Sequence, residues 1–419
     1  MTSRISHPAR RRVALSVGGL LVLLTLALLL RPEGPWGHKL WPAEAIEPHV
    51  AASGTQLSYC WMEVAGAGEV ATAIAVQRSQ DGGETFGPVE HVAAPGERLS
   101  ADPTLAFGQD GTLYLSWLAF RSHRSIESEP FDMAIVVATA GPGSKHFGPP
   151  QFVAEDRQTT YDKPWSTVDS EGVLHVVYRA AWGNRAGLYD TQLFPDGHRQ
   201  HRILVEEPGF SGALPVVCSD PAAPRHVVAY LRPERGIELR VFDTASIGEG
   251  QLLSQPQERV AHEGPSCVFS QGQVFVSYGV SDGVWDSARS PLLRQIVVAR
   301  RAQDGGIQRH IIETKGELLM HPQLLPPSGQ LGPLIQLGYL AGRRENDPAA
   351  TLRLATLQPG LPPAWTVETL RDGLQLTAHR EDRRWPGDYL GAARLGERAV
   401  VAYIDNHRRR QAKLLFAKP

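Results

Sequence analysis

The chain has 419 residues, 42% of them hydrophobic and 21% charged. It is long enough to bury a large core, and its composition excludes both a disordered chain and a bundle of membrane helices. The formal net charge of −2 leaves no overall field that would attract nucleic acid, so any recognition of charge must be local.

Residues 1–34 differ from the rest of the chain. Arg10, Arg11 and Arg12 precede an uncharged run of 18 residues, 13–30, and Arg31 and Pro32 follow it. Such a run reaches the lower limit for crossing a bilayer, roughly 17 residues, and exceeds the usual core of a signal peptide, about 7 to 15. We predict one N-terminal hydrophobic helix that anchors the protein in a membrane, with the arginines in the cytoplasm and residues 35–419 outside it, in the periplasm or at the cell surface. A cleaved signal, which would make the protein secreted, is the alternative.

A five-residue pattern recurs along the remaining chain: an apolar residue, any residue, an apolar residue, a small or apolar residue, then Trp or Tyr. Its seven copies occupy residues 57–61, 113–117, 174–178, 226–230, 274–278, 335–339 and 399–403. The final aromatic residues are 48 to 64 residues apart, about the length of one four-stranded propeller blade with its loops. Short β-branched and alternating apolar runs, bounded by Gly, Pro, Asp and Ser, surround each copy and indicate strands.

These copies predict an all-β fold, a β-propeller in which each copy is the second strand of a blade and its aromatic residue packs between blades. Seven blades are favoured; six is the alternative, if residues 335–339 belong to an insertion. Residues 258–260 are expected to form the outer strand of the fourth blade. The chain stops after the third strand of the last blade, so residues 39–45 are expected to supply the missing outer strand.

The cysteines are three in number: Cys60, Cys218 and Cys267. Their odd number and lack of metal-ligand spacing favour three small buried hydrophobic residues. A disulfide between Cys218 and Cys267 is the alternative, because both lie in the inner-strand regions of consecutive blades.

The loop after residue 78 contains the most specific motif of the chain. Ser79, Asp81, Gly83, Thr85 and Phe86 match the pattern S-x-D-x-G-x-T-F, a turn in which Asp accepts backbone hydrogen bonds and Gly adopts a conformation closed to other residues. This Asp box resembles the BNR repeat of sialidases and their non-catalytic relatives, as do the segments YDKPW (161–165) and GDYLG (387–391). The resemblance implies a sialidase-like propeller over residues 35–419, with a structural Asp box and a ligand face on the opposite side.

Two series of ionisable residues should line that opposite face, at the starts of the first strands and the ends of the second strands. Arginines among them suit anionic groups, which a guanidinium binds through two parallel hydrogen bonds. We predict a ligand site at the mouth of the channel, made of Asp102, Arg121, Asp162, Lys163, Arg179, Asp388, Tyr389 and Asp405.

The resemblance to sialidases also suggests which residues to examine for catalysis. Sialidases use a Tyr nucleophile, a carboxylate that activates it and an acid/base Asp, and Tyr389, Asp388 and Asp405 are the candidates for these roles here. The chain departs from the family because Glu47, Pro48 and His49 stand where sialidases have Arg-Ile-Pro. The catalytic residues therefore stay unassigned.

Three functions are compatible with the sequence: an extracytoplasmic propeller that binds a glycan or another polar or anionic ligand, an exo-sialidase-type glycoside hydrolase, and a protein-interaction scaffold of the cell envelope. The 15 histidines show no ligand spacing such as H-E-x-x-H, so we expect no metal and no cofactor. We also expect a monomer without a nucleic-acid partner.

Overall fold

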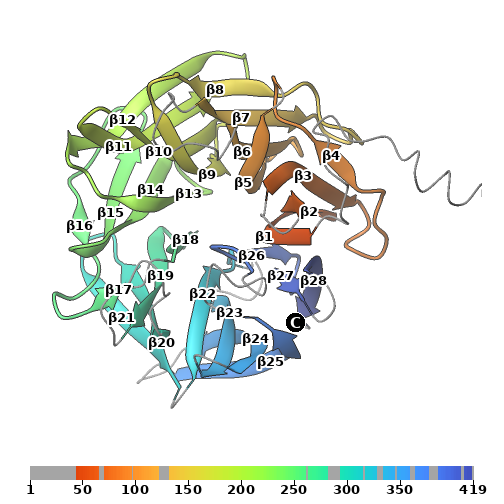
Figure 1. Cartoon of the computed structure of the whole chain (residues 1–419). Coiled ribbons are helices and arrows are strands. Elements are labelled where there is room, and N and C mark those ends of the chain that lie inside the picture. Colours follow the sequence, from red (N-terminus) through yellow and green to blue (C-terminus); the bar gives the residue numbers. More distant parts are fainter. Residues whose placement is uncertain are drawn as a thin grey trace, which may run out of the picture.

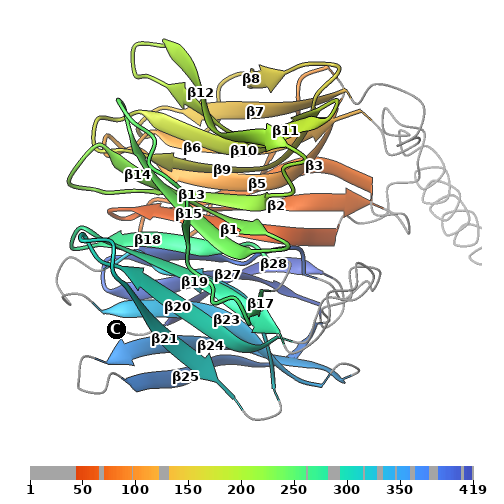
Figure 2. The ribbon, with the colours of Figure 1, turned by 90° about the vertical axis from the view of Figure 1, so that its left-hand side faces the viewer.

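The structure, a computed structural model, describes residues 44–65, 70–96, 98–121, 132–260, 263–281, 293–314, 317–327, 334–344, 347–358, 364–376, 386–406 and 410–417. Seven antiparallel sheets surround one axis (Figure 1), and their strands run side by side across the disc (Figure 2). The inner strands contact one another in the order β1, β5, β9, β13, β18, β22 and β26, and β26 contacts β1. The fold is therefore a closed, seven-bladed β-propeller, as the aromatic repeat predicts.

Each of the first three blades has four strands. They are β1 (Glu44–Ser53), β2 (Gln56–Ala65), β3 (Val70–Ser79) and β4 (Glu90–Val92); β5 (Leu99–Phe107), β6 (Leu113–Phe120), β7 (Met133–Ala140) and β8 (Gln151–Glu155); and β9 (Thr160–Val168), β10 (Leu174–Trp182), β11 (Arg185–Leu193) and β12 (Arg199–Pro208).

The other four blades are less uniform. Their strands are β13 (Ala213–Ser219), β14 (Arg225–Arg232), β15 (Gly236–Asp243) and β16 (Gln251–Leu252); β17 (Arg259–Val260), β18 (Ser266–Ser270), β19 (Gln273–Ser281), β20 (Leu293–Arg301) and β21 (Ile307–Glu313); β22 (Leu318–Leu324), β23 (Ile335–Arg344), β24 (Asp347–Gln358) and β25 (Ala364–Gln375); and β26 (Gly391–Leu395), β27 (Arg398–Asp405) and β28 (Gln411–Ala417).

The repeated pattern marks the second strand of every blade. All seven copies lie in β2, β6, β10, β14, β19, β23 and β27, and each of these strands pairs with an inner strand on one side and a third strand on the other. Four of the final aromatic side chains, Trp117, Tyr230, Tyr278 and Tyr339, are fully buried. They belong to apolar clusters that join neighbouring sheets, so the prediction that they pack between blades is confirmed.

A bulge interrupts the inner strand of five blades at the residue before a proline. Glu47, Asp102, Lys163, Leu214 and His321 have φ angles between 47° and 53°, and the register of each strand shifts at that point. A left-handed conformation costs a residue other than Gly about 1 to 2 kcal/mol. In return, the bulge breaks the strict alternation of side chains and gives each blade one more position facing its neighbours.

Two strands differ from the sequence-based expectation. Residues 259–260 do not form the outer strand of blade four; β17 pairs instead with β19 of blade five, next to β18. The reason is a break in the inner strand of blade five, which is split into β17 and β18. Glu44 and Ala45 are not an outer strand of blade seven either, because they begin β1 and pair with β2. Residues 39–43 of that expected strand lie outside the described residues, and so does the predicted N-terminal helix.

Besides the packing of β26 against β1, two contacts join the ends of the described chain. The Ala45 amide donates to the Arg410 carbonyl oxygen (2.9 Å), and Arg410 Nε lies 2.8 Å from Glu44 Oε2. Within the described residues, the sheet of blade seven contains three strands. That same part of the chain contains no helix long and apolar enough to span a membrane.

The Cys218–Cys267 disulfide is present, with a Cα–Cα distance of 5.9 Å, and Cys60 is a buried free thiol. The favoured interpretation of three unpaired cysteines is therefore wrong for two of them. The bridge joins β13 of blade four to β18 of blade five, two inner strands that lie side by side. Disulfides are typical of proteins in oxidising compartments.

Candidate functional site

Five ionisable residues from four blades meet at the centre of the ring, and we call them the Lys163 cluster: Glu47, Asp102, Asp162, Lys163 and Asp388. Lys163 Nζ lies 3.1 Å from Glu47 Oε1 and 2.7 Å from Asp388 Oδ2, and it also pairs with the Asp102 carboxylate. The Glu47, Asp102 and Asp388 side chains are at most 8% exposed, whereas that of Lys163 is 14% exposed. One ammonium group thus holds three buried carboxylates together, and a small part of the Lys163 side chain remains exposed.

The bulges of the inner strands bring three of these residues together. Glu47, Asp102 and Lys163 occupy the same left-handed position in blades one, two and three. Leu214 occupies it in blade four and belongs to an apolar cluster, so the bulge itself is part of the architecture. The chemistry comes from the side chains that the first three blades carry there.

Asp388 reaches the cluster because blade seven lies very close to β1. A Cβ atom on Gly387 (φ 110°) would lie 2.4 Å from Glu47 Cγ, and one on Gly391 would lie 2.6 Å from the Val50 nitrogen. The Glu47 amide also donates to the Pro386 carbonyl oxygen at 2.9 Å. Glycine at these two positions therefore permits the approach that delivers Asp388.

Three aromatic rings lie against the cluster: His49, Trp165 and Tyr389. The centroid of His49 is 5.1 Å from that of Trp165, and Trp165 is 5.5 Å from Tyr389. The Tyr389 hydroxyl donates to the Pro103 carbonyl oxygen (3.0 Å), and His49 Nδ1 accepts from the Leu105 amide (3.2 Å). These bonds fix both side chains, and burial lowers the pKa of His49 to about 4, so this ring is neutral at pH 7.

A pocket of about 370 Å³ lies on the other side of His49. Its lining comes from the later parts of the inner strands, and includes Ala52, Phe107 and Val168 together with Pro326 and Arg394. Small and apolar residues line the pocket together with the polar side chains of His49, Ser166, Thr167 and Arg394. Of the three aromatic rings, His49 also lines this pocket, so the Lys163 cluster and the pocket lie on either side of His49.

Burial and mutual charge perturb the pKa values of the cluster strongly. Burial raises the pKa of Glu47 well above its usual value, and it raises that of Asp162 to about 6, with the Asp102 carboxylate contributing. Burial opposes the charge on Lys163, but the carboxylates of Asp102, Asp388 and Glu47 outweigh it and raise its pKa. Lys163 is therefore a permanent cation, while Asp162, partly exposed, changes charge near neutral pH.

The structure brings together five of the eight residues that the sequence analysis assigned to a ligand site: Asp102, Asp162, Lys163, Asp388 and Tyr389. Arg179, on β10, is half-buried, pairs through Nε with the Gly212 carbonyl oxygen (3.1 Å), and lies close enough to lower the pKa of Asp162.

The remaining two residues are engaged elsewhere. Arg121 is 59% exposed and binds Asp132 at 3.0 Å, while Asp405 lies 3.9 Å from Arg371. Glu47 was not among the predicted ligand-site residues, although its position before Pro48, like that of Asp102 before Pro103, was a signal that could have found it.

The Asp box forms the turn that its sequence predicts. Ser79 Oγ accepts from the Gly83 amide (2.8 Å), and Asp81 Oδ1 accepts from the Thr85 amide (2.9 Å). Hydrogen bonds from Thr85 and Ser79 lower the pKa of Asp81. Phe86 packs edge-on against Tyr59, with centroids 5.7 Å apart. The turn contacts blade seven through Arg398, which donates to the Gly82 carbonyl oxygen at 2.6 Å, so it lies at the junction of the first and last blades.

Seven antiparallel sheets closed in this way define a propeller of the kind found in sialidases and in related glycosidases and lyases. An ulvan lyase of polysaccharide lyase family PL25 is similar over 90% of this chain and 93% of its own, at 9% identity and a TM-score of 0.53. The Trypanosoma rangeli sialidase in complex with the inhibitor DANA matches 89% of this chain at 11% identity and a TM-score of 0.47. The phage phi92 endosialidase matches 89% of this chain and 66% of its own, at 10% identity and a TM-score of 0.49.

The chain spans about half the length of the T. rangeli sialidase, 54%. No protein-family model matches the chain, and no curated protein sequence does. At identities this low, the likeness establishes the fold alone.

Proposed function

We propose that the protein is an extracytoplasmic propeller that binds a glycan at the mouth of its channel, on the Lys163 cluster. The main observation behind this proposal is that four carboxylates surround one lysine. The equivalent bulge position of blade four is occupied by an apolar residue, Leu214, so the bulge itself does not require a charged side chain. Replacing buried ion pairs by well-packed apolar side chains is often neutral or stabilising for a fold. A cluster of buried charges at the centre of the ring therefore favours a use beyond stability.

The charges of the site favour a sugar rich in hydroxyl groups over an acidic one. Glu47, Asp102, Asp162 and Asp388 outnumber the neighbouring cations, Lys163 and Arg179. Carboxylates accept hydrogen bonds from hydroxyl groups, whereas they repel a second carboxylate or a sulfate. The partly exposed residues, Asp162, Lys163 and Arg179, would contact the ligand, and the buried ones would hold Lys163 in place.

The Cys218–Cys267 disulfide supports a location outside the cytoplasm, where such bonds persist. The membrane anchor over residues 1–34 stays a prediction from the sequence. Large exposed apolar side chains within the described residues lie singly on five different blades, at Val89, Ile203, Ile247, Ile311 and Val367. Scattered residues of this kind are normal on a protein surface, so they do not favour the scaffold function.

A sialidase-type hydrolase receives less support from the geometry than glycan binding does. The Tyr389 hydroxyl is buried and donates to a backbone carbonyl group, and burial raises its pKa well above the usual value. An activated nucleophile needs the opposite, a lowered pKa or an adjacent base that accepts its proton.

The test is a glycan array with the purified full-length protein, followed by affinity measurements on a soluble oligosaccharide that it selects. Asp162→Asn and Arg179→Gln should each weaken binding at least 10-fold, because a hydrogen bond to a charged group contributes roughly 1.5 to 3 kcal/mol. Arg185→Gln, at an exposed arginine of the same blade paired with Glu206, should leave the affinity unchanged. Unchanged binding in both site variants, or an array that selects only acidic glycans, would contradict the proposal.

A further inference from the structure

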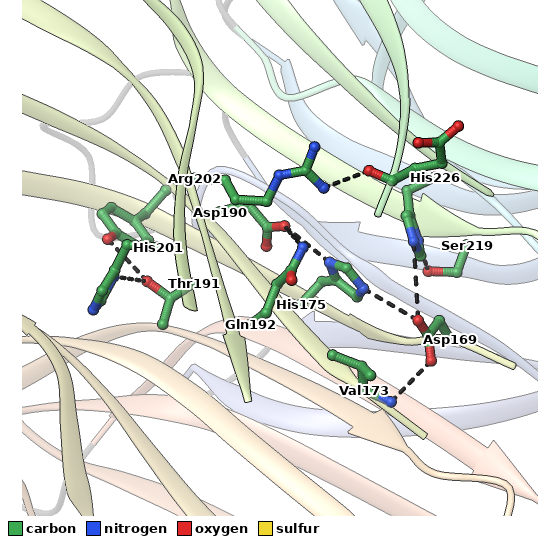
Figure 3. Close-up of polar contacts among 12 residues, drawn as sticks. Asp169, Val173, His175, Asp190, Thr191, Gln192, His201, Arg202, Ser219 and His226 are labelled. Carbon is green, nitrogen blue, oxygen red and sulfur yellow. Dashed lines mark hydrogen bonds and ion pairs between the residues drawn. The ribbon is translucent and has the colours of Figure 1, made fainter. Parts of the chain in front are cut away.

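A second polar cluster, which shares no residue with the Lys163 cluster, lies between blades three and four (Figure 3). Asp169 follows β9, His175 is near the start of β10, and His226 is near the start of β14 in the next blade. All three side chains are at most 1% exposed, and the two imidazole rings lie 4.0 Å apart. Three metal-ligand side chains from two blades thus share one buried volume.

The backbone fixes the carboxylate of this cluster. Asp169 Oδ1 accepts from the amides of Glu171 (2.9 Å) and Val173 (2.8 Å), which holds the tight turn between β9 and β10. The other oxygen, Oδ2, points toward the imidazoles, 3.3 Å from His175 Nε2 and 3.9 Å from His226 Nε2 (Figure 3). The carboxylate is therefore already oriented for a shared ligand.

His226 Nε2 is the one ring nitrogen of the two histidines without a hydrogen bond. It is buried and has no hydrogen-bond partner, while its Nδ1 lies 2.9 Å from Ser219 Oγ. An unpaired buried polar atom costs about 1 to 3 kcal/mol. A metal ion between His226 Nε2, His175 Nε2 and Asp169 Oδ2 would remove this cost.

The surroundings of the imidazoles match those of metal-bound histidines. A ligating His usually donates its other ring N–H to a carboxylate, a carbonyl group or water, which fixes the tautomer and leaves the first nitrogen free to bind the metal. His175 Nδ1 lies 2.9 Å from Asp190 Oδ2, and Gln192 Nε2 donates to the same oxygen at 3.0 Å (Figure 3). Ser219 completes the equivalent arrangement for His226.

We propose that Asp169, His175 and His226 bind a divalent transition-metal ion, Zn²⁺, which joins blades three and four. The three ligand atoms lie within 4.8 Å of one another, and zinc bonds of about 2.0 to 2.1 Å require side-chain shifts of only about 1 Å. Two imidazoles and a carboxylate are ligands that zinc prefers. Three protein ligands leave the fourth tetrahedral position to a water molecule, and the near-complete burial excludes a larger substrate, so the role is structural. A divalent ion also balances the buried charges of Asp169 and Asp190.

The competing occupant is a proton. Without a metal, His175 would be an imidazolium between Asp169 and Asp190, a geometry that the same distances permit. The two alternatives differ in metal content, in the effect of chelators and in the role of His226, because a protonated His175 needs no contribution from His226 Nε2.

The test measures metal content of the full-length protein after chelator treatment and dialysis, followed by titration with Zn²⁺ and with Co²⁺. We expect one saturable equivalent, the visible absorption of tetrahedral Co²⁺, and a higher Tm with the metal than without it. His175→Gln and His226→Gln should abolish uptake, and Asp190→Asn should weaken it about 10- to 100-fold. The matched control is His201→Gln, because His201 is exposed on β12 and bonds Thr191 away from the three ligands (Figure 3).

Two results would overturn the proposal: wild-type protein that takes up no metal, or a His226→Gln variant that binds it as tightly as wild type does. If the histidine variants do not fold, X-ray absorption at the zinc edge of the loaded wild-type protein decides the question. Two imidazole nitrogens, a carboxylate oxygen and one water oxygen support the site, and a spectrum without the two imidazoles refutes it.

Discussion

Replacing Lys163 by Met tests the central cluster most directly. The substitution keeps the length of the side chain and removes the cation that pairs with Glu47, Asp102 and Asp388. Removing one partner of a buried ion pair costs about 3 to 5 kcal/mol, because the other charge stays buried without compensation. With an unfolding entropy of about 0.8 kcal/mol/K for roughly 370 residues, the expected fall in Tm is roughly 4 to 6 °C.

The loss of stability in the Lys163→Met variant should also depend on pH, because the remaining carboxyl groups of the cluster titrate. Burial already raises the pKa of Glu47, and loss of the ammonium raises it further. The folded state then binds more protons than the unfolded state, so the variant keeps stability at low pH and loses it as pH rises. The deficit in Tm should be larger at pH 8 than at pH 5. Lys413→Met, at an exposed lysine of β28, should change the free energy of unfolding by less than about 0.5 kcal/mol. An equal deficit at both pH values, or none, would refute the reasoning.

Three further predictions use other parts of the ring. Reducing the Cys218–Cys267 bridge should lower the free energy of unfolding by about 4 kcal/mol, since its ends are 49 residues apart; thermal melts with and without reductant measure this, and equal melting temperatures would contradict it. Gly83→Ala should lower the free energy of unfolding, measured by chemical denaturation, more than Gly54→Ala does. Both glycines have positive φ, but a Cβ on Gly83 would lie 2.4 Å from the Phe416 ring in the last strand of blade seven, whereas Gly54 faces open space. Asp162→Asn should stabilise the protein above pH 6. The pKa of Asp162 is raised to about 6, so the stability that this residue contributes is present below pH 4 and is lost as pH rises through 6. The melting temperatures of the wild type and the variant should therefore converge toward pH 4.

The repeat made the fold predictable because each blade repeats one packing problem. An aromatic residue at the end of every second strand fills the space between sheets, as Trp117 and Tyr230 do, and its spacing along the chain counts the blades. The outer strands were less predictable, because little packing constrains them. Residues 259–260 therefore joined β19 in the next sheet instead of their own blade.

The site was predictable only where strand position decided it. Asp102 and Lys163 occupy equivalent bulge positions of their inner strands, and Asp388 lies just before the inner strand of blade seven, so the blades bring them together. Arg179 lies within β10, whereas Arg121 follows the end of β6, where Asp132, in the segment leading into β7, pairs with it. His175 and His226 lie in consecutive copies of the repeat, 51 residues apart, but no metal-ligand spacing links them along the chain, and the contact between two neighbouring blades unites them.

The contacts that close the ring also set a time scale for its assembly. Glu44 and Arg410, which pair in the closed ring, are 366 residues apart in the chain. At about 5 to 20 residues per second, roughly 20 to 70 s separate the synthesis of these two residues. The entropic cost of closing so long a loop is modest, about 5 kcal/mol. The delay before the last blade is synthesised is therefore the greater obstacle to correct assembly. During that interval β1 lacks its neighbour from the same chain, and blade seven of a second copy can take the vacant place, which makes swapped dimers the expected misassembly product at high expression levels.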